Sequence, residues 1–368
     1  MTRADRWAAT MAGRRVGADV RQAHADGFEI RVGPLEPLDR QARETAEDAV
    51  LASGATRANG AGTRARHEDA DPWRTCFERD RDRILHSSSF RRLAGKTQVF
   101  IFPADHQRTR LTHALEVAQV ATAIGRACRL NVALVEAIAL GHDCGHGPGG
   151  HASEDALGLF VPGFDHAVWG ADITAAPLNL CTETLDGIRN HSWSRPSPAT
   201  PEGQVVSLAD RVAYCAHDLE DALHAGVVEA GDLPTEITDW CGTTRSTQLR
   251  SFVTDIVGTT AGAGLVGLSE QAADTLAALR RFNHERIYLR PESRRQADSV
   301  VAVLRALVEY YLAHPSELPE SPWTADCTDP VLAAVAYVDG MTDRFACTQA
   351  VTLLDWPIDR LPRGLDLS

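Results

Sequence analysis

Apolar residues recur at every third or fourth position over long stretches of the chain, and this spacing predicts a mainly α fold. The clearest stretch is 112–129, where the apolar positions are Leu115, Ala118, Val120, Ala121 and Ile124. The same pattern predicts further helices over 131–141, 202–225, 269–281 and 292–313. The alternation typical of strands is scarce, so we expect a multi-helical fold with few or no strands.

Interruptions of this pattern indicate three parts of the chain. Residues 42–66 are rich in Ala, Gly, Thr and Arg and have little apolar periodicity, which is typical of a linker or mobile arm. We therefore expect an N-terminal arm, partly flexible, over 1–70 and a packed core over 71–225. A helical C-terminal part, 226–368, is expected to pack on that core.

Composition narrows the class of protein. With 368 residues, 44% of them hydrophobic, the chain can bury a substantial core without disulfides. Its eight cysteines are scattered and form no C-x-x-C pair, so they indicate neither a zinc ribbon nor a disulfide framework, and a reducing cytoplasm is the expected compartment. No apolar stretch approaches the roughly 20 residues of a membrane span, so no membrane association is expected.

The charge distribution indicates the kind of ligand. The net charge of −13 makes general affinity for nucleic acid improbable, because phosphate backbones would be repelled. Residues 79–110 nevertheless carry eight basic side chains against three acidic ones. Such a local excess suits a compact polyanion such as a nucleoside triphosphate, although a solvated helix face with mixed charges remains an equal alternative.

Four side chains of metal-binding type lie in helical contexts: His113, the adjacent pair His142 and Asp143, and Asp210. Two imidazoles and two carboxylates suit magnesium or a divalent first-row metal. Apolar neighbours predict that these groups are buried, and buried carboxylates need a partner or a metal. A lone His-Asp pair is commonplace and usually structural, but a His 29 residues before the pair and an Asp 67 residues after it make a more specific pattern.

A glycine-rich turn, GHGPGGHASED, follows the His-Asp pair and contains His146, His151 and Glu154. If a helix begins at Ala152, His151 and Glu154 share one face, and a coupled imidazole and carboxylate can position and deprotonate a water for attack on phosphorus. The alternative is a polar loop with accidental histidines.

A third group of polar side chains shares one helix stripe with Asp210, since Tyr214 follows at i+4 and Asp218 at i+8. A metal ligand, an aromatic wall and a hydrogen-bond acceptor would then line one pocket. The alternative assigns Tyr214 to the core and Asp218 to the surface.

The sequence Gly95-Lys96-Thr97 resembles the end of a phosphate-binding loop but does not complete one. The P-loop pattern requires a glycine where Phe90 stands. A kinase or P-loop NTPase is therefore excluded as an interpretation.

Several collinear blocks resemble the dGTP triphosphohydrolase group of the HD superfamily. The blocks are RDRDRILHSSSFRRLAGKTQVF, RTRLTHALEVAQVA, ALGHDCGHGPGGHASED, LNLCTETLDGIRNH, VVSLADRVAYCAHDLEDAL and YVDGMTDRFA. They cover roughly 73–225 and a patch at 337–346. The resemblance implies that the predicted core, 71–225, is an HD-domain catalytic core.

The resemblance also implies roles for individual residues. The family's ligands to a divalent metal ion (Mg, Mn, Fe, Co or Zn) match His113, His142, Asp143 and Asp210. Catalytic residues that activate the water or lie near the phosphates match His151, Glu154, His146 and His166.

The substrate-binding residues implied by the resemblance are Arg110 and Arg211 toward the triphosphate or base, Gln98 and Asp218 toward the 3′-hydroxyl, and Tyr214 beneath the sugar. The implied reaction is attack of water at the α-phosphorus of a dNTP, dGTP or a broader set, releasing a deoxynucleoside and tripolyphosphate. Arg281 and Tyr288 are further candidates for the pocket.

Two motifs depart from the family pattern. Relatives usually read HDLGHPPFGHAGE and FEHN, whereas this chain has glycines at 147 and 149 and an alanine at 167. We expect the extra glycines to loosen the loop that carries His146 and His151 and to affect substrate preference and turnover.

Two other functions remain open. The chain is alternatively another HD-domain nucleotide phosphohydrolase, a nucleotidase or phosphodiesterase, or a catalytically weak nucleotide-binding assembly protein with affinity for single-stranded nucleic acid. A homo-oligomer is expected from the resemblance.

Overall fold

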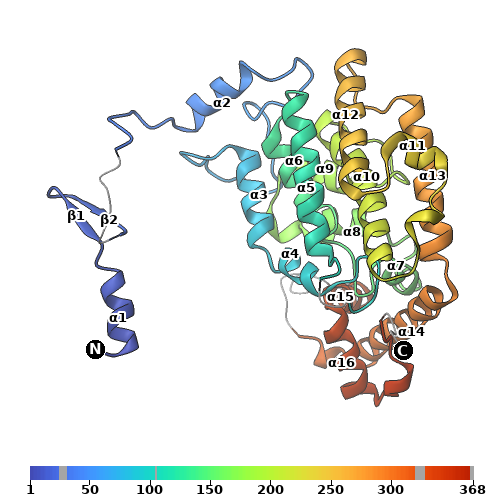
Figure 1. Ribbon diagram of the computed structural model, residues 1–368. Helices are drawn as coiled ribbons and strands as arrows, with labels where there is room; N and C mark the ends of the chain where they lie inside the picture. The colour runs from blue at the N-terminus through green and yellow to red at the C-terminus, as the bar shows by residue number, and fades with distance from the viewer. Residues whose placement is uncertain (25–30, 104–105, 320–327, 365–368) are drawn as a thin grey trace. The chain divides into compact units, whose positions relative to one another are not determined.

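The computed structural model describes residues 1–24, 31–103, 106–319 and 328–364, and it confirms the mainly α fold. The chain divides into two compact units, Met1–Leu38 and Asp39–Ser368. The first unit contains α1 (Arg3–Thr10) and the antiparallel pair β1 (Arg14–Val16) and β2 (Val20–Gln22), which are the only strands among the described residues (Figure 1).

The second unit is built from helices, joined in several places by single 3₁₀ or π turns (Figure 1). The helices are α2 (Arg40–Asp48), α3 (Cys76–His86), α4 (Ser88–Arg92), α5 (Arg110–Ala127), α6 (Val132–Gly141), α7 (Ala152–Leu157), α8 (His166–Trp169), α9 (Thr182–Asn190), α10 (Pro201–His224), α11 (Thr235–Cys241), α12 (Arg245–Ala263), α13 (Glu270–Asn283), α14 (Pro291–Ala313), α15 (Pro330–Asp339) and α16 (Asp343–Leu354).

The five helices predicted from periodicity are confirmed as α5, α6, α10, α13 and α14, with ends that differ by one or two residues. Capping side chains fix the first turns of α5, α6 and α10. Thr109 accepts a hydrogen bond from the backbone N–H of Thr112 at the start of α5, and Asn131 accepts one from Leu134 at the start of α6. Thr200 caps α10, whose first residue is Pro201.

The main core lies where α5, α6 and α10 pack against one another, side by side in Figure 1. Ile124, Leu134, Ile138 and Val212 are fully buried there. A second apolar cluster joins α14, α15 and α16 to α7, with Leu307 fully buried among them. The two clusters fix the ends of the helices that carry the candidate site residues.

The expectation that 42–66 is a linker or mobile arm is wrong in this structure. Leu51, Ala55 and Ala58 are buried in the main core, and Arg64 forms a buried ion pair with Asp80 at 2.6 Å. The segment packs through a few apolar side chains, the ion pairs of Arg64 with Asp80 and of Arg43 with Glu78, and hydrogen bonds such as those of Thr56 with Glu202, and such packing produces no periodic apolar signal. The boundary between the core and the C-terminal part near 225 stays a prediction.

Two further properties concern the described residues only. No helix among them is both long and apolar enough to cross a membrane. The seven cysteines described have free thiols, and Cys327 lies outside the described residues.

Candidate active site

The four predicted metal ligands, from α5, α10 and the turn after α6, converge in space. His113 Nε2 lies 3.1 Å from Asp210 Oδ1 and 3.8 Å from Asp143 Oδ2. His142 Nε2 lies 3.5 Å from Asp143 Oδ2 and 3.6 Å from Asp210 Oδ1. Ligand atoms about 2.0–2.2 Å from one ion stand about 3–3.5 Å apart, so this spacing fits a single divalent metal.

A hydrogen bond of His142 orients its ring for binding a metal. Its Nδ1 donates to the carbonyl oxygen of Ala139 at 2.7 Å, so Nε2 is the nitrogen left to bind a metal, which would displace its proton. Within the described residues, this buried Nε2 has no hydrogen-bond partner. A buried nitrogen without a partner, facing two carboxylates, is the observation that fits the group to a metal.

The electrostatics of this cluster are those of a buried charge network. Burial lowers the pKa of His142, but Asp143 and Asp210 outweigh it and raise that pKa to about 9. Burial raises the pKa of the Asp143 and Asp210 carboxyls, but the neighbouring histidines outweigh this effect and hold each pKa well below its usual range. At Asp143 the positive charge of Arg110 acts in the same direction. Both carboxylates are therefore ionised and suited to a cation.

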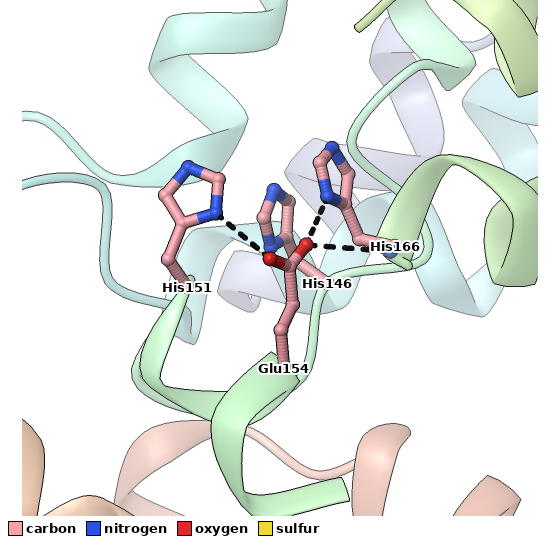
Figure 2. Close-up of side chains that lie close together, drawn as sticks. All are labelled: His146, His151, Glu154 and His166. Carbon is pink, nitrogen blue, oxygen red and sulfur yellow. Dashed lines mark hydrogen bonds and ion pairs between the residues drawn. The ribbon is translucent and has the colours of Figure 1, made fainter. Parts of the chain in front are cut away.

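A second cluster contains the four residues predicted to be catalytic, His146, His151, Glu154 and His166 (Figure 2). Because α7 begins at Ala152, as predicted, Glu154 faces His151, whose Nδ1 lies 3.4 Å from Glu154 Oε2. On its other side the Glu154 carboxylate accepts a hydrogen bond from His166 Nδ1, and Figure 2 shows it between the two rings. Burial raises the pKa of Glu154, but these hydrogen bonds outweigh it and hold the pKa below its usual range.

His191, at the end of α9, was missed by the sequence predictions and contacts His166. Its Nδ1 donates to the carbonyl oxygen of Ile188 at 2.8 Å, and burial lowers its pKa to about 4. The neutral ring therefore offers Nε2 as an acceptor to His166 Nε2, 3.3 Å away. The Glu154 carboxylate and the His191 ring thus hold the two ring nitrogens of His166.

His146 links the two clusters. Its Nε2 lies 3.2 Å from Asp143 Oδ1, so Nε2 carries the proton and donates. Burial, together with Arg110, holds the pKa of His146 well below its usual range, and its neutral ring stacks on His166 with centroids 3.6 Å apart. The metal-type and catalytic-type groups thus form one continuous network.

A cavity of about 1010 Å³ opens onto this network. All the predicted site residues except His142 and Glu154 line it, as do the further candidates Arg281 and Tyr288. Within the described residues, six buried polar atoms of the lining residues lack hydrogen-bond partners: Gln98 Oε1, Arg110 Nε, His113 Nδ1, His146 Nδ1, Arg211 Nε and Asp218 Oδ1. Such groups require a ligand or water to satisfy them.

Tyr214 and Asp218 both belong to this cavity, so the alternative that placed Asp218 on the surface is wrong. Burial raises the pKa of Asp218 to about 7, and Tyr288 donates to its Oδ2 at 2.5 Å. The Tyr214 hydroxyl accepts hydrogen bonds from Arg211 at 2.6 Å and from Arg280 at 3.0 Å. Arg280 lies in no quoted motif, whereas His191 is the last residue of the block LNLCTETLDGIRNH.

The two predicted phosphate-binding arginines differ in their surroundings. Arg110 is buried, and its Nη1 donates to Asp143 Oδ2 at 2.7 Å, so it borders the metal-type cluster. Arg211 lies over the rings of Trp193 and Tyr214, with centroids 4.4 and 5.4 Å away. Trp193 is a further lining residue that the sequence predictions missed.

The expectation of a loose glycine-rich loop is wrong. Residues 141–150 are buried throughout. A Cβ at Gly147 would stand 2.7 Å from Ser153 Cβ, and one at Gly149 would stand 2.6 Å from Val300 Cγ1. The glycines permit close packing, and Val300 of α14 occupies the space that a side chain at 149 would need.

Comparison with known proteins agrees with this geometry. The family model for the HD domain matches residues 110–215, and that for the phosphohydrolase-associated domain matches 266–351. A deoxyguanosinetriphosphate triphosphohydrolase-like protein of Caldanaerobacter subterraneus subsp. tengcongensis is 39% identical over 316 residues, which cover 83% of this chain and 93% of that protein. One from Clostridium perfringens strain 13 is 43% identical, covering 77% and 88%.

A solved phosphohydrolase structure from Bacteroides thetaiotaomicron matches with a TM-score of 0.45 and 18% identity, over 72% of this chain and 66% of that one. The sequence relatives, which this chain matches over most of their length, confirm the resemblance. The chain belongs to the deoxyguanosinetriphosphate triphosphohydrolase-like proteins, a family of HD-domain phosphohydrolases.

Proposed function

We propose that this protein hydrolyses deoxynucleoside triphosphates, with a divalent metal, to a deoxynucleoside and tripolyphosphate. The observation that carries the proposal is the convergence of His113, His142, Asp143 and Asp210 at the wall of the large cavity. These residues would hold the ion, which when bound stabilises negative charge developing on the phosphoryl oxygens. The names of the relatives support the same substrate class.

His151 and Glu154 are suited to activate the attacking water. With Nδ1 donating to the Glu154 carboxylate, His151 has its Nε2 free to accept the proton of water. The water oxygen bonds to the α-phosphorus and the bond from phosphorus to the 5′-oxygen breaks. The 5′-oxygen gains a proton and leaves as the deoxynucleoside hydroxyl, while the three phosphates remain joined.

Positive charge near the phosphates comes from the arginines of the cavity. His166 is held beside them between the Glu154 carboxylate and Nε2 of His191. Arg211 has a buried Nε without a partner in the described structure, so this N–H can donate a hydrogen bond to a phosphate oxygen. Fixed cations at this place would stabilise the charge of the transition state.

The sugar end of the cavity supports a deoxyribose. Gln98 and Asp218 each present a buried oxygen that has no partner among the described residues, as a 3′-hydroxyl would require. The Tyr214 ring is held by Arg211 and Arg280, so it forms a fixed wall that a 2′-hydroxyl would have to displace. Steric exclusion of this kind favours a deoxynucleotide over a ribonucleotide.

The test is a panel of four dNTPs and four rNTPs with Mg, Mn, Fe, Co or Zn, with products resolved by ion-exchange chromatography. Tripolyphosphate from dNTPs is expected, with loss of activity in His113→Ala and Glu154→Ala and with Gly258→Ala of α12 as the active control. Pyrophosphate or orthophosphate would identify another phosphohydrolase. Binding of dNTP without turnover would identify a nucleotide-binding assembly protein.

We also propose a homo-oligomer, as the resemblance implies, in a reducing cytoplasm, as the scattered cysteines indicate. Light scattering of the purified chain measures its mass directly. A single-chain mass with full activity would contradict the oligomer.

A further inference from the structure

The block YVDGMTDRFA, at the end of α15 and the start of α16, has no part in the reaction proposed above. It lies outside the residues that match the HD domain and within those that match the phosphohydrolase-associated domain. The structure nevertheless places it against the catalytic loop, residues 145–151. Asp343, the first residue of α16, contacts the loop directly, and the backbone carbonyl of Asp339 is joined to it through Lys96.

The Asp343 carboxylate accepts two hydrogen bonds from residues that lie far before it in the sequence. Its Oδ1 accepts from the backbone N–H of Gly149 at 2.8 Å, across 194 residues of chain. Its Oδ2 accepts from the Thr97 hydroxyl at 2.6 Å. Asp343 is 5% exposed, so each donor would be buried without an acceptor if the carboxylate were removed.

Lys96 holds the other end of the same loop. Its buried Nζ donates to the carbonyl oxygen of His146 and, at 2.9 Å, to that of Asp339. Its own carbonyl accepts from the backbone N–H of Arg110 at 3.2 Å, at the start of the helix that carries His113. Lys96 and Asp343 therefore tie the loop at 146 and at 149 to the ends of α15 and α16.

Local contacts also hold the loop, including the hydrogen bond that the Gly147 N–H donates to the Ser153 hydroxyl at 3.1 Å. Gly149 has a φ of +74°, a conformation that costs a non-glycine residue strain, and Val300 is packed directly against it. His151 follows two residues later and has a side chain 73% exposed, and its ring is packed mainly against the edges of His146 and His166. The place of His151 relative to Glu154 thus depends on the backbone before it.

We propose that Asp343, together with Lys96, is a positioning residue that sets the backbone of the catalytic loop and so the places of His146 and His151. The proposal rests on the proposed function, because it gives that loop its catalytic role. Asp343 touches neither substrate nor reacting atoms. Its effect passes through the Gly149 N–H and the Thr97 hydroxyl.

The hydrogen-bond chemistry supplies a matched pair of variants. In Asp343→Asn the amide oxygen can accept from Gly149, and the amide nitrogen can donate to the Thr97 hydroxyl, which also accepts. In Asp343→Ala both bonds are lost. Gln349→Ala is the control on the same helix, because it removes a hydrogen bond from Tyr311 without touching the loop.

The experiment measures kcat, KM and amide hydrogen exchange of the full chain with manganese, under conditions where every variant is folded. Asp343→Ala is expected to lower kcat by about 100-fold, the cost of a displacement of about 1 Å, and to change KM less. Exchange at 147–150 is expected to accelerate in Asp343→Ala. Asp343→Asn and Gln349→Ala are expected to match the wild type in both respects.

Unchanged exchange at 147–150 in Asp343→Ala, or an Asp343→Asn variant as impaired as the alanine variant, would overturn the proposal. If Asp343→Ala does not fold, Thr97→Val takes its place, with smaller changes expected in the same direction; wild-type kcat and exchange in that variant would equally overturn it. If the wild type releases no tripolyphosphate, the proposed function fails, while exchange still decides whether Asp343 fixes the loop.

Discussion

Replacing Gly149 with alanine is expected to destabilise the protein by about 1–5 kcal/mol. The left-handed backbone at φ +74° costs an alanine about 1–2 kcal/mol. The new Cβ would stand 2.6 Å from Val300 Cγ1, and overpacking of this kind costs about 1–3 kcal/mol. The lower entropy of the unfolded alanine chain returns about 0.4–1 kcal/mol.

Urea unfolding of the metal-free chain measures this difference. Val300→Ala removes the atom that the new Cβ would meet, so the double variant should be more stable than the sum of the single changes by about 1 kcal/mol or more. Gly258→Ala is the matched control, because nothing lies within 4 Å of its Cβ position in α12 and alanine should stabilise that helix by about 0.5–1 kcal/mol. Wild-type stability in Gly149→Ala, or strict additivity with Val300→Ala, would refute the close packing of the loop.

Three further predictions concern charge, protonation and the sugar. Burial raises the pKa of Asp339 from 3.8 to about 7, so this carboxyl contributes stability at low pH that is lost as pH rises through 7. The stability of Asp339→Asn relative to wild type, measured by urea unfolding, should therefore increase by up to about 3 kcal/mol from pH 5 to pH 8. The same difference in stability at both pH values would contradict this prediction. His191→Ala removes the acceptor of His166 Nε2 and should lower kcat by about 10- to 100-fold with a smaller change in KM in steady-state kinetics, whereas an unchanged kcat would rule out this role. Tyr214→Ala should raise the kcat/KM of rNTPs relative to dNTPs in competition assays, and an unchanged ratio would show that the ring does not exclude the 2′-hydroxyl.

Much of the fold and the metal-type cluster could be predicted from the sequence because their signals are local. Apolar periodicity predicted α5, α6, α10, α13 and α14. The spacing of His113, the His142-Asp143 pair and Asp210 along such helices indicated one site, and the structure brings these side chains together.

The remaining features depend on contacts between distant parts of the chain. Asp343 reaches Gly149 across 194 residues, and nothing near either residue indicates the other. The role of His191 depends on its hydrogen bond to the carbonyl oxygen of Ile188, at the end of α9, and on its contact with His166, 25 residues earlier in the sequence. The glycines at 147 and 149 suggested a flexible loop. In the structure a glycine is needed at 149, because Val300 of α14 packs where a side chain would lie.

Hydrolysis of dGTP in water enriched in oxygen-18, with manganese and purified protein, tests the central claim most directly. Attack of water at the α-phosphorus places one labelled oxygen in tripolyphosphate and leaves the deoxyguanosine unlabelled, which mass spectrometry of the two products resolves. Label in the nucleoside, a shorter phosphate product, or no hydrolysis under any divalent metal would contradict the account.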